Sequence, residues 1–168
     1  FLNSTWEYDG VNWTLVTTAS SPSARGKHTM AYDSAREKVV IFGGEWVQGN
    51  FLNSTWEYDG VDWTHVTTAN VPAARGRHSM AYDSARGKVV MFGGTSYIPG
   101  TNNHLYPTDT WEYDGVDWTQ VTTTSAPSAR YGHAMVYDSV RGKVVLFGGS
   151  GVSFGLSNTF SFPITLPY

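Results

Sequence analysis

The 168-residue sequence contains no cysteine, which excludes disulfide bridges, thiolate metal ligands and a cysteine nucleophile. Charged residues make up only 15% of the chain, the net charge is −3 and no basic run occurs. The broad positive field of a nucleic-acid-binding protein is therefore missing. No apolar run approaches the roughly 20 residues that span a bilayer, and no stretch keeps the 3.6-residue period of a helix. We expect an all-β protein with no nucleic-acid partner and no membrane span.

What the sequence does contain is a long internal repeat. A stretch of 20 residues begins at Arg25, Arg75 and Arg130, and each copy ends on a Gly-Gly pair. Successive copies are offset by 50 and then by 55 residues. The segments Phe1–Gly44 and Phe51–Gly94 differ at nine of 44 positions. A period of this length indicates an array of similar structural units.

Each unit contains four short segments that alternate with a period of two, as β-strands do. In the first complete unit these segments are residues 28–32, 38–42, 55–58 and 63–67. The Asp59-Gly60 pair between the last two is a strong hairpin signal. The turn between the first two ends in glycine at positions 87 and 142, as a type I turn with a bulge favours. Glu37 occupies this position in the first unit, which predicts local strain or a different turn.

Four-stranded units of this length, each unable to bury both of its faces alone, are typical of β-propellers. The unit resembles the bacterial-type kelch repeat, in which a Gly-Gly doublet closes the second strand and Tyr and Trp follow in the third and fourth. This pattern is filled by Gly43-Gly44, Tyr58 and Trp63, and again by Gly93-Gly94, Tyr113 and Trp118. The resemblance implies propeller blades of four antiparallel strands.

The number of repeat units predicts that the chain associates with further blades. Residues 1–168 divide into a partial blade with strands three and four at 1–18, complete blades at 25–68 and 75–123, and a partial blade with strands one to three at 130–162. Closed propellers have 4–8 blades, so three blade-equivalents do not close a ring. We expect a homodimer that closes a six-bladed ring by strand exchange, an open-ended polymer, or a place in a larger array. A third-strand match at 159–162 competes with residues 3–8 for one place.

The copies differ most in the loops that follow each Gly-Gly pair, at 45–50, 95–106 and 150–156. Strand parity places these loops on the same rim as the lead-in segments 22–25, 72–75 and 127–130. Variation confined to loops on a repeated scaffold is typical of a recognition surface. The candidate ligand-binding residues here are Glu45, Trp46, Gln48, Tyr97, Asn102, Asn103, His104, Tyr106 and Phe154. Aromatic faces beside amides suit a carbohydrate or protein ligand, although the loops could equally be tolerated insertions with locally packed aromatics.

Three arginines are further candidates, because Arg25, Arg75 and Arg130 each precede a histidine by three residues and could form an anion site near the channel mouth. In the alternative interpretation each arginine binds backbone carbonyls or a neighbouring glutamate, at position 7, 57 or 112. The repeated histidines at 28, 78 and 133 would lie on a ring too wide for one ion. We therefore expect no metal and no cofactor.

The sequence predicts a non-catalytic binding or scaffold module that is extracellular or at the cell surface. Outside the repeat consensus we find no carboxylate pair, no nucleophile with its base and no phosphate-binding loop. Two alternatives stay open. One is a self-assembling structural polymer subunit, and the other is a sugar-modifying enzyme with its site in the propeller channel.

Overall fold

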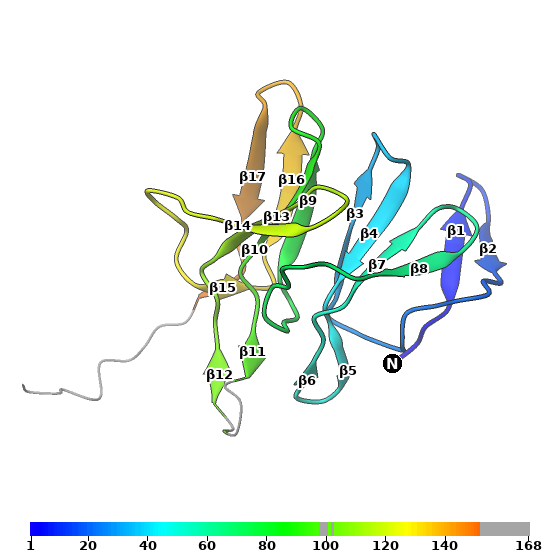
Figure 1. The fold of residues 1–168 in the computed structure, drawn as a ribbon, viewed down its shortest axis with the longest axis horizontal. Helices are drawn as coiled ribbons and strands as arrows, with labels where there is room; N and C mark the ends of the chain where they lie inside the picture. The colour runs from blue at the N-terminus through cyan, green and yellow to red at the C-terminus, as the bar shows by residue number, and fades with distance from the viewer. Residues whose placement is uncertain (98–100, 102, 152–168) are drawn as a thin grey trace, which may run out of the picture.

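The computed structural model describes residues 1–97, 101 and 103–151, and all the regular secondary structure in them is β-strand (Figure 1). The expected all-β fold is therefore confirmed. None of these residues belongs to a helix long and apolar enough to cross a membrane. The expected strand at 159–162 lies outside the described residues.

Two complete four-stranded antiparallel blades form the middle of the chain. The first blade consists of β3 (Thr29–Asp33), β4 (Lys38–Phe42), β7 (Thr55–Tyr58) and β8 (Trp63–Val66), and the second of β9 (Ser79–Asp83), β10 (Lys88–Phe92), β13 (Thr110–Tyr113) and β14 (Trp118–Val121). Strand order follows sequence order in both. The register is also the same, because Phe42 lies opposite Thr55 as Phe92 lies opposite Thr110.

A half-blade flanks this pair on each side. The N-terminal half-blade is the hairpin of β1 (Thr5–Tyr8) and β2 (Trp13–Val16), which corresponds to strands three and four. The C-terminal half-blade is the hairpin of β16 (Ala134–Asp138) and β17 (Lys143–Phe147), which corresponds to strands one and two. Within the described residues each half-blade is a two-stranded sheet.

The turn between the first two strands of a blade is built by an aspartate. Asp33 Oδ1 accepts hydrogen bonds from the backbone N–H groups of Ala35 and Arg36, both at 3.2 Å. The turn ends in the left-handed region, with φ of +54° at Glu37 and +65° at Gly87. The first blade thus has the same turn as the second, and Glu37 carries the strain that a side chain meets there.

The core lies between blades, where Trp and Tyr of one blade reach the preceding blade. The Trp118 indole donates to Thr55 Oγ1 at 2.9 Å, and the Tyr113 hydroxyl donates to Glu57 at 2.8 Å. Phe42 fills the space beneath them, with its ring centroid 5.1 Å from that of Trp118. The strand β9 lies between β3 and β16, so the inner strands of three units stand side by side (Figure 1).

Short hairpins continue from the Gly-Gly pairs and form a rim. They are β5 (Glu45–Val47) with β6 (Asn50–Phe51), β11 (Ser96–Tyr97) with β12 (His104–Leu105), and the pair β15 (Arg130–Tyr131) with β18 (Ser150–Gly151). Figure 1 shows the β5–β6 and β11–β12 hairpins projecting from the same side of the blades.

Candidate functional site

The rim brings each lead-in segment against the loop that follows a Gly-Gly pair, as strand parity predicts. Gly26 and Glu45 exchange two backbone hydrogen bonds at 2.9 and 2.8 Å, and Gly76 and Thr95 exchange two of the same lengths. The β15–β18 pair repeats this arrangement at the third unit. The glycines at 43 and 44 allow it, because each has positive φ and a Cβ there would meet backbone oxygen within 3 Å.

A cavity of about 290 Å³ opens between the rim hairpins of the two complete blades. It is lined by Lys27, Glu45, Gln48, Phe51, Arg77, Thr95, Tyr97, His104, Tyr106 and Tyr131. Its size is that of the smaller ligand pockets. The cavity therefore unites five of the candidate residues from the sequence with five that the sequence interpretation did not include.

One wall of the cavity is a continuous series of aromatic rings in contact, two pairs tilted and two pairs stacked. Phe51 lies 5.4 Å from Tyr97, and Tyr97 lies 4.4 Å from His104. The series continues from His104 to Tyr106 at 5.9 Å and from Tyr106 to Tyr131 at 5.7 Å, the last two pairs within 28° of parallel. The Thr95 hydroxyl lies 3.2 Å from His104 Nδ1 and fixes that ring. Flat faces are thus held ready along the cavity.

The charged groups that line the cavity are one buried carboxylate and two cations. Glu45 forms an ion pair with Lys27 and accepts a hydrogen bond from the Gly49 N–H at 2.6 Å. Burial raises the pKa of Glu45, but Lys27, the Gly49 N–H and the charge of Arg77 lower it by more, so the carboxylate stays ionised. The guanidinium of Arg77 lies over the Tyr131 ring at 5.5 Å and has no ion-pair partner in the described part of the chain.

The three candidate arginines lie away from this cavity and bind their own blades. Arg25 donates to the carbonyls of Ser23 and Gly43 and to the Ser54 hydroxyl at 3.0–3.1 Å. Arg130 makes the equivalent bonds to the carbonyls of Ser128 and Gly148.

Arg75 makes the corresponding backbone bonds and adds a bidentate pair with Asp109, at 2.6 and 2.8 Å. Backbone carbonyls are therefore shared partners of all three arginines. The expected glutamate partners are wrong: Glu57 instead accepts from Arg36 and Tyr113, and Glu112 from Arg86.

The remaining candidates are scattered. Trp46 is exposed on β5 and does not line the cavity, and the Asn103 side chain is exposed beside β12. Asn102 and Phe154 lie outside the described residues. Two of the repeated histidines pack between blades, His78 against Phe42 and His133 against Phe92, with ring centroids 5.7 and 5.8 Å apart. Burial, with the charge of Arg75, lowers the pKa of His78 to about 3, so this ring is neutral.

Lys27, Phe51 and Arg77 were missed because they belong to the repeated framework, whereas Thr95 begins the loop 95–106 and Tyr131 departs from the repeat. The first two repeats have Gly26-Lys27 and Gly76-Arg77 where the third has Tyr131-Gly132. This break in the repeat is the sequence signal that could have identified Tyr131. A comparison confined to the loops that follow each Gly-Gly pair does not detect it.

The blades, their shared register and the Gly-Gly rim define a segment of a kelch-type β-propeller. The sequence model of the KLHDC2/KLHL20/DRC7 Kelch-repeats domain matches residues 3–165, so the chain belongs to this kelch-repeat family. Curated proteins give no match.

Among solved structures, the chain is similar to one described as "Structure of YjhT", with a TM-score of 0.62 and 14% sequence identity. The match covers 83% of this chain and 41% of that one. This chain thus spans less than half of the neighbour's length, and at this identity the likeness shows the fold alone.

Proposed function

We propose that the chain is a non-catalytic binding module whose rim cavity holds a carbohydrate. The observation that carries the proposal is the series of aromatic rings in contact from Phe51 to Tyr131 beside the ionised Glu45. Sugar rings present an apolar face that packs on aromatic side chains, and hydroxyls around the edge that donate to carboxylates and amides. Glu45 and Gln48 supply such acceptors next to the rings.

The size of the site favours a sugar over a protein partner. A protein interface extends over about 800 Å² of surface on each side. A cavity of about 290 Å³ instead has a size that suits a small ligand. Arg77, with its guanidinium over Tyr131, adds a cation that can bind a carboxylate or sulfate on the ligand. An acidic oligosaccharide is therefore expected to bind more tightly than its neutral counterpart.

Two further features belong to the same proposal. The module assembles by strand exchange between chains, which would place several rim cavities on one particle and strengthen binding to a polymeric glycan. It acts outside the cell or at the cell surface, where such glycans are met. Cell fractionation with an antibody against the chain tests this location.

A glycan array with matched neutral and uronic-acid oligosaccharides tests the ligand class. We expect the folded chain to retain acidic oligosaccharides, and Tyr106→Ala to weaken their binding about tenfold, the loss expected for one stacked ring. Arg77→Ala is expected to weaken the acidic ligands more than the neutral ones. Titration calorimetry of each variant provides the affinities.

Trp46→Ala is the matched control, because it removes an exposed aromatic of the same rim that does not line the cavity. Its affinity is expected to equal that of the unchanged chain. Binding lost in Trp46→Ala and kept in Tyr106→Ala would move the site out of the cavity. A folded chain that retains no oligosaccharide would contradict the carbohydrate proposal.

A further inference from the structure

We propose that the two half-blades complete each other between two copies of this chain, with β17 of one copy pairing antiparallel with β1 of the other. Two such composite blades would close a ring of two chains. The inference rests on the assembly part of the proposed function and is independent of the rim cavity. The two strands would pair in one defined register, with specific side-chain contacts at both open edges.

The two intact blades supply the register. Phe92 lies opposite Thr110 and Val89 opposite Tyr113, and the first blade repeats these pairs. The sequence of β1 is identical to that of β7, and the Lys-Val-Val-x-Phe pattern of β17 matches β4 and β10. The expected pairs between copies are Phe147 with Thr5, Leu146 with Trp6, Val145 with Glu7, and Val144 with Tyr8.

Phe147 is the anchor of this pairing. It is 82% exposed, whereas Phe42 and Phe92 at the same position are 0% and 3% exposed. Phe42 is covered by the rings of His78 and Trp118 in the following blade. Because this position is buried in both complete blades and exposed in the half-blade, the surface that covers it in the complete blades is missing here.

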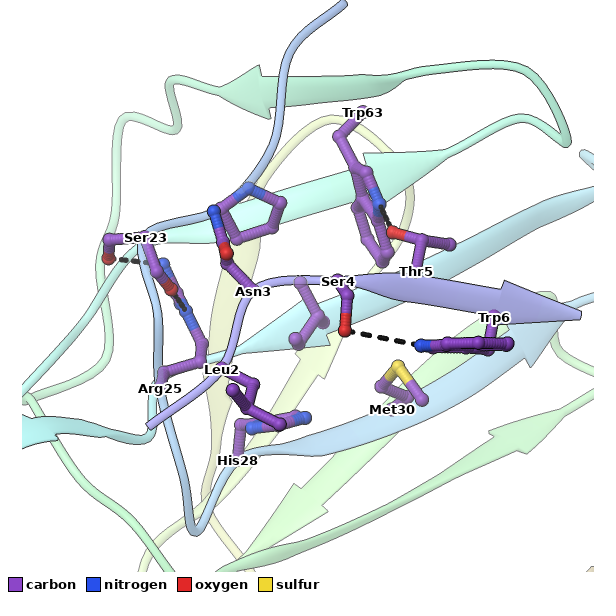
Figure 2. A pocket seen from close by; sticks show the side chains of 12 residues that line it. Leu2, Asn3, Ser4, Thr5, Trp6, Ser23, Arg25, His28, Met30 and Trp63 are labelled. Atoms are coloured by element: carbon purple, nitrogen blue, oxygen red, sulfur yellow. Dashed lines mark hydrogen bonds between the residues drawn. The ribbon is translucent and has the colours of Figure 1, made fainter. Parts of the chain in front are cut away.

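The cavity that would receive Phe147 lies in the N-terminal half of the chain. A cavity of about 260 Å³ is lined by residues of β1, β3 and the lead-in segment, together with His28 before β3 and Trp63 of β8 (Figure 2). These two residues correspond to His78 and Trp118, which hold Phe42. Figure 2 shows Leu2 beside His28 and Met30 beside Trp6 around the opening. Phe147 of a second copy would enter where Phe42 enters in the intact pair.

Charged groups at the two edges are complementary as well. In the intact blades the arginine of the first turn binds the glutamate of the third strand, as Arg36 binds Glu57 and Arg86 binds Glu112. Glu7 accepts from Tyr58 but has no arginine within the described residues. Arg141 is exposed and binds only Asp138 of its own turn there. Pairing the copies brings Arg141 to Glu7.

A second ion pair of the complete blades is also missing its partners in the half-blades. Lys38 binds Asp59 at 3.5 Å and Lys88 binds Asp114 at 3.3 Å. Lys143 and Asp9 occupy the same positions in the half-blades, and neither has an ion-pair partner in the described part of the chain. The composite blade would join them.

The opposite face of β1 and β2 gains partners from the second blade of the other copy. Tyr58 and Trp63 donate to Glu7 and Thr5 of the preceding blade, at 2.7 and 2.8 Å. By the same geometry Tyr8 would donate to Glu112, and Trp13 to Thr110. Tyr8 and Trp13 are both largely exposed in a single chain. Each composite blade thus buries both of its faces.

The proposed number of copies follows from closure. The described residues of each copy supply three blade-equivalents, so two copies give six blades and three copies give nine, and closed propellers typically have 4–8. The competing segment 159–162 has Ser161 where β1 has Glu7, so it offers Arg141 no carboxylate. The β1 strand of a second copy is therefore the better partner for β17.

The first test is the mass of the full 168-residue chain by light scattering and sedimentation. We expect a discrete dimer.

Phe147→Asp is expected to raise the dissociation constant by about 100-fold or more, as loss of one fully buried phenylalanine predicts. Because Phe147 is exposed in the single chain, the variant is expected to stay folded, with an unchanged circular dichroism spectrum. It also keeps its rim, so glycan binding by each chain separates failure of assembly from failure of the ligand proposal.

The second test fixes the register, using the absence of native cysteine. A Leu146→Cys chain is mixed with a Trp6→Cys chain and, separately, with a Ser4→Cys chain, and oxidised. Directly opposite residues lie within disulfide range, and residues displaced by two do not. We expect cross-linked dimers from the 146–6 mixture and few from the 146–4 mixture.

Four results would overturn the proposal. One is a full chain that stays monomeric at all concentrations. A second is dimerisation only of a chain shortened to end at residue 151, which would assign the edge to the segment beyond. Another is equal cross-linking in both mixtures. The last is an open-ended series of larger species, which would replace the closed pair with a polymer.

Discussion

The second blade and the N-terminal half-blade carry nearly the same hairpin in different surroundings. Trp118 is 0% exposed and Trp13 is 65% exposed, although each lies 5.1 Å from the tyrosine opposite it at nearly the same interplanar angle. Trp63, which has a half-blade before it, is 7% exposed. The local hairpin therefore forms from its own sequence, and its burial depends on the neighbouring blade. Blades in this chain are units of local structure but not of core formation.

The largest difference is expected between the two equivalent phenylalanines. Phe92→Ala empties a filled space between blades and should lower the free energy of unfolding by about 3–5 kcal/mol. Phe147→Ala should change it by less than about 1 kcal/mol in dilute, monomeric protein, because its ring is already in water. Urea unfolding at low concentration measures both. Equal losses would show that Phe147 is covered within its own chain.

A smaller difference is expected between the arginines of the rim. Asp109→Asn leaves the fully buried Arg75 without its carboxylate and should cost about 2–4 kcal/mol, a value reduced because Asp109 is partly exposed. Ser54 occupies this position in the first blade, where Ser54→Ala should cost only about 1 kcal/mol. Thermal and urea unfolding of both variants give the comparison. A similar loss for the two would mean that the Asp109 pair adds nothing to the backbone bonds.

The ion pair between Arg75 and Asp109 predicts that the stability depends on pH. Burial raises the pKa of Asp109, but the hydrogen bonds and charge of Arg75 and the Trp111 indole lower it by more, so the folded value lies below the ordinary one. Its stabilisation is therefore present above the unfolded pKa near 4 and is lost as the pH falls through the folded pKa. Unfolding free energies measured from pH 6 to pH 2 should fall less steeply for Asp109→Asn. Parallel curves would contradict the assignment.

The smallest effect concerns the first turn of each complete blade. Glu37→Gly should stabilise the chain by about 1 kcal/mol, because glycine relieves the positive φ that Glu37 adopts. Gly87→Ala is the matched opposite, since no atom lies within 4 Å of the added Cβ and only backbone strain is introduced. It should destabilise by a similar amount. Differential scanning calorimetry provides the two shifts, and shifts of the same sign would refute the strain argument.

Most of the fold could be predicted from the sequence, because repeats turn weak local patterns into a consistent one. The Gly-Gly pairs, the Asp-Gly turns and the spacing of Tyr58 and Trp63 were enough to order four strands in each blade. Strand parity also predicted that lead-in segments and loops share a rim. These features depend on local backbone chemistry, which the sequence states directly.

The site was only partly predictable, for a physical reason. Loop variation identified Glu45, Tyr97 and Tyr106, but the cavity also needs Lys27 and Arg77, which belong to the framework. Their role depends on how neighbouring blades are placed, and no pattern along one strand records that placement. The backbone carbonyls expected for the arginines are found, but the expected glutamates are not, because Glu57 faces the following blade and not the rim.

Hydrogen exchange of the full chain, measured far above and far below the association concentration, tests most directly whether the half-blades complete each other. We predict that amides of β1 and β17 become protected at high concentration, while those of β10 are protected at both. Phe147→Asp should abolish the change in β1 and β17 and leave β10 as it was. Exchange in β1 and β17 that stays fast at every concentration would contradict the composite blade.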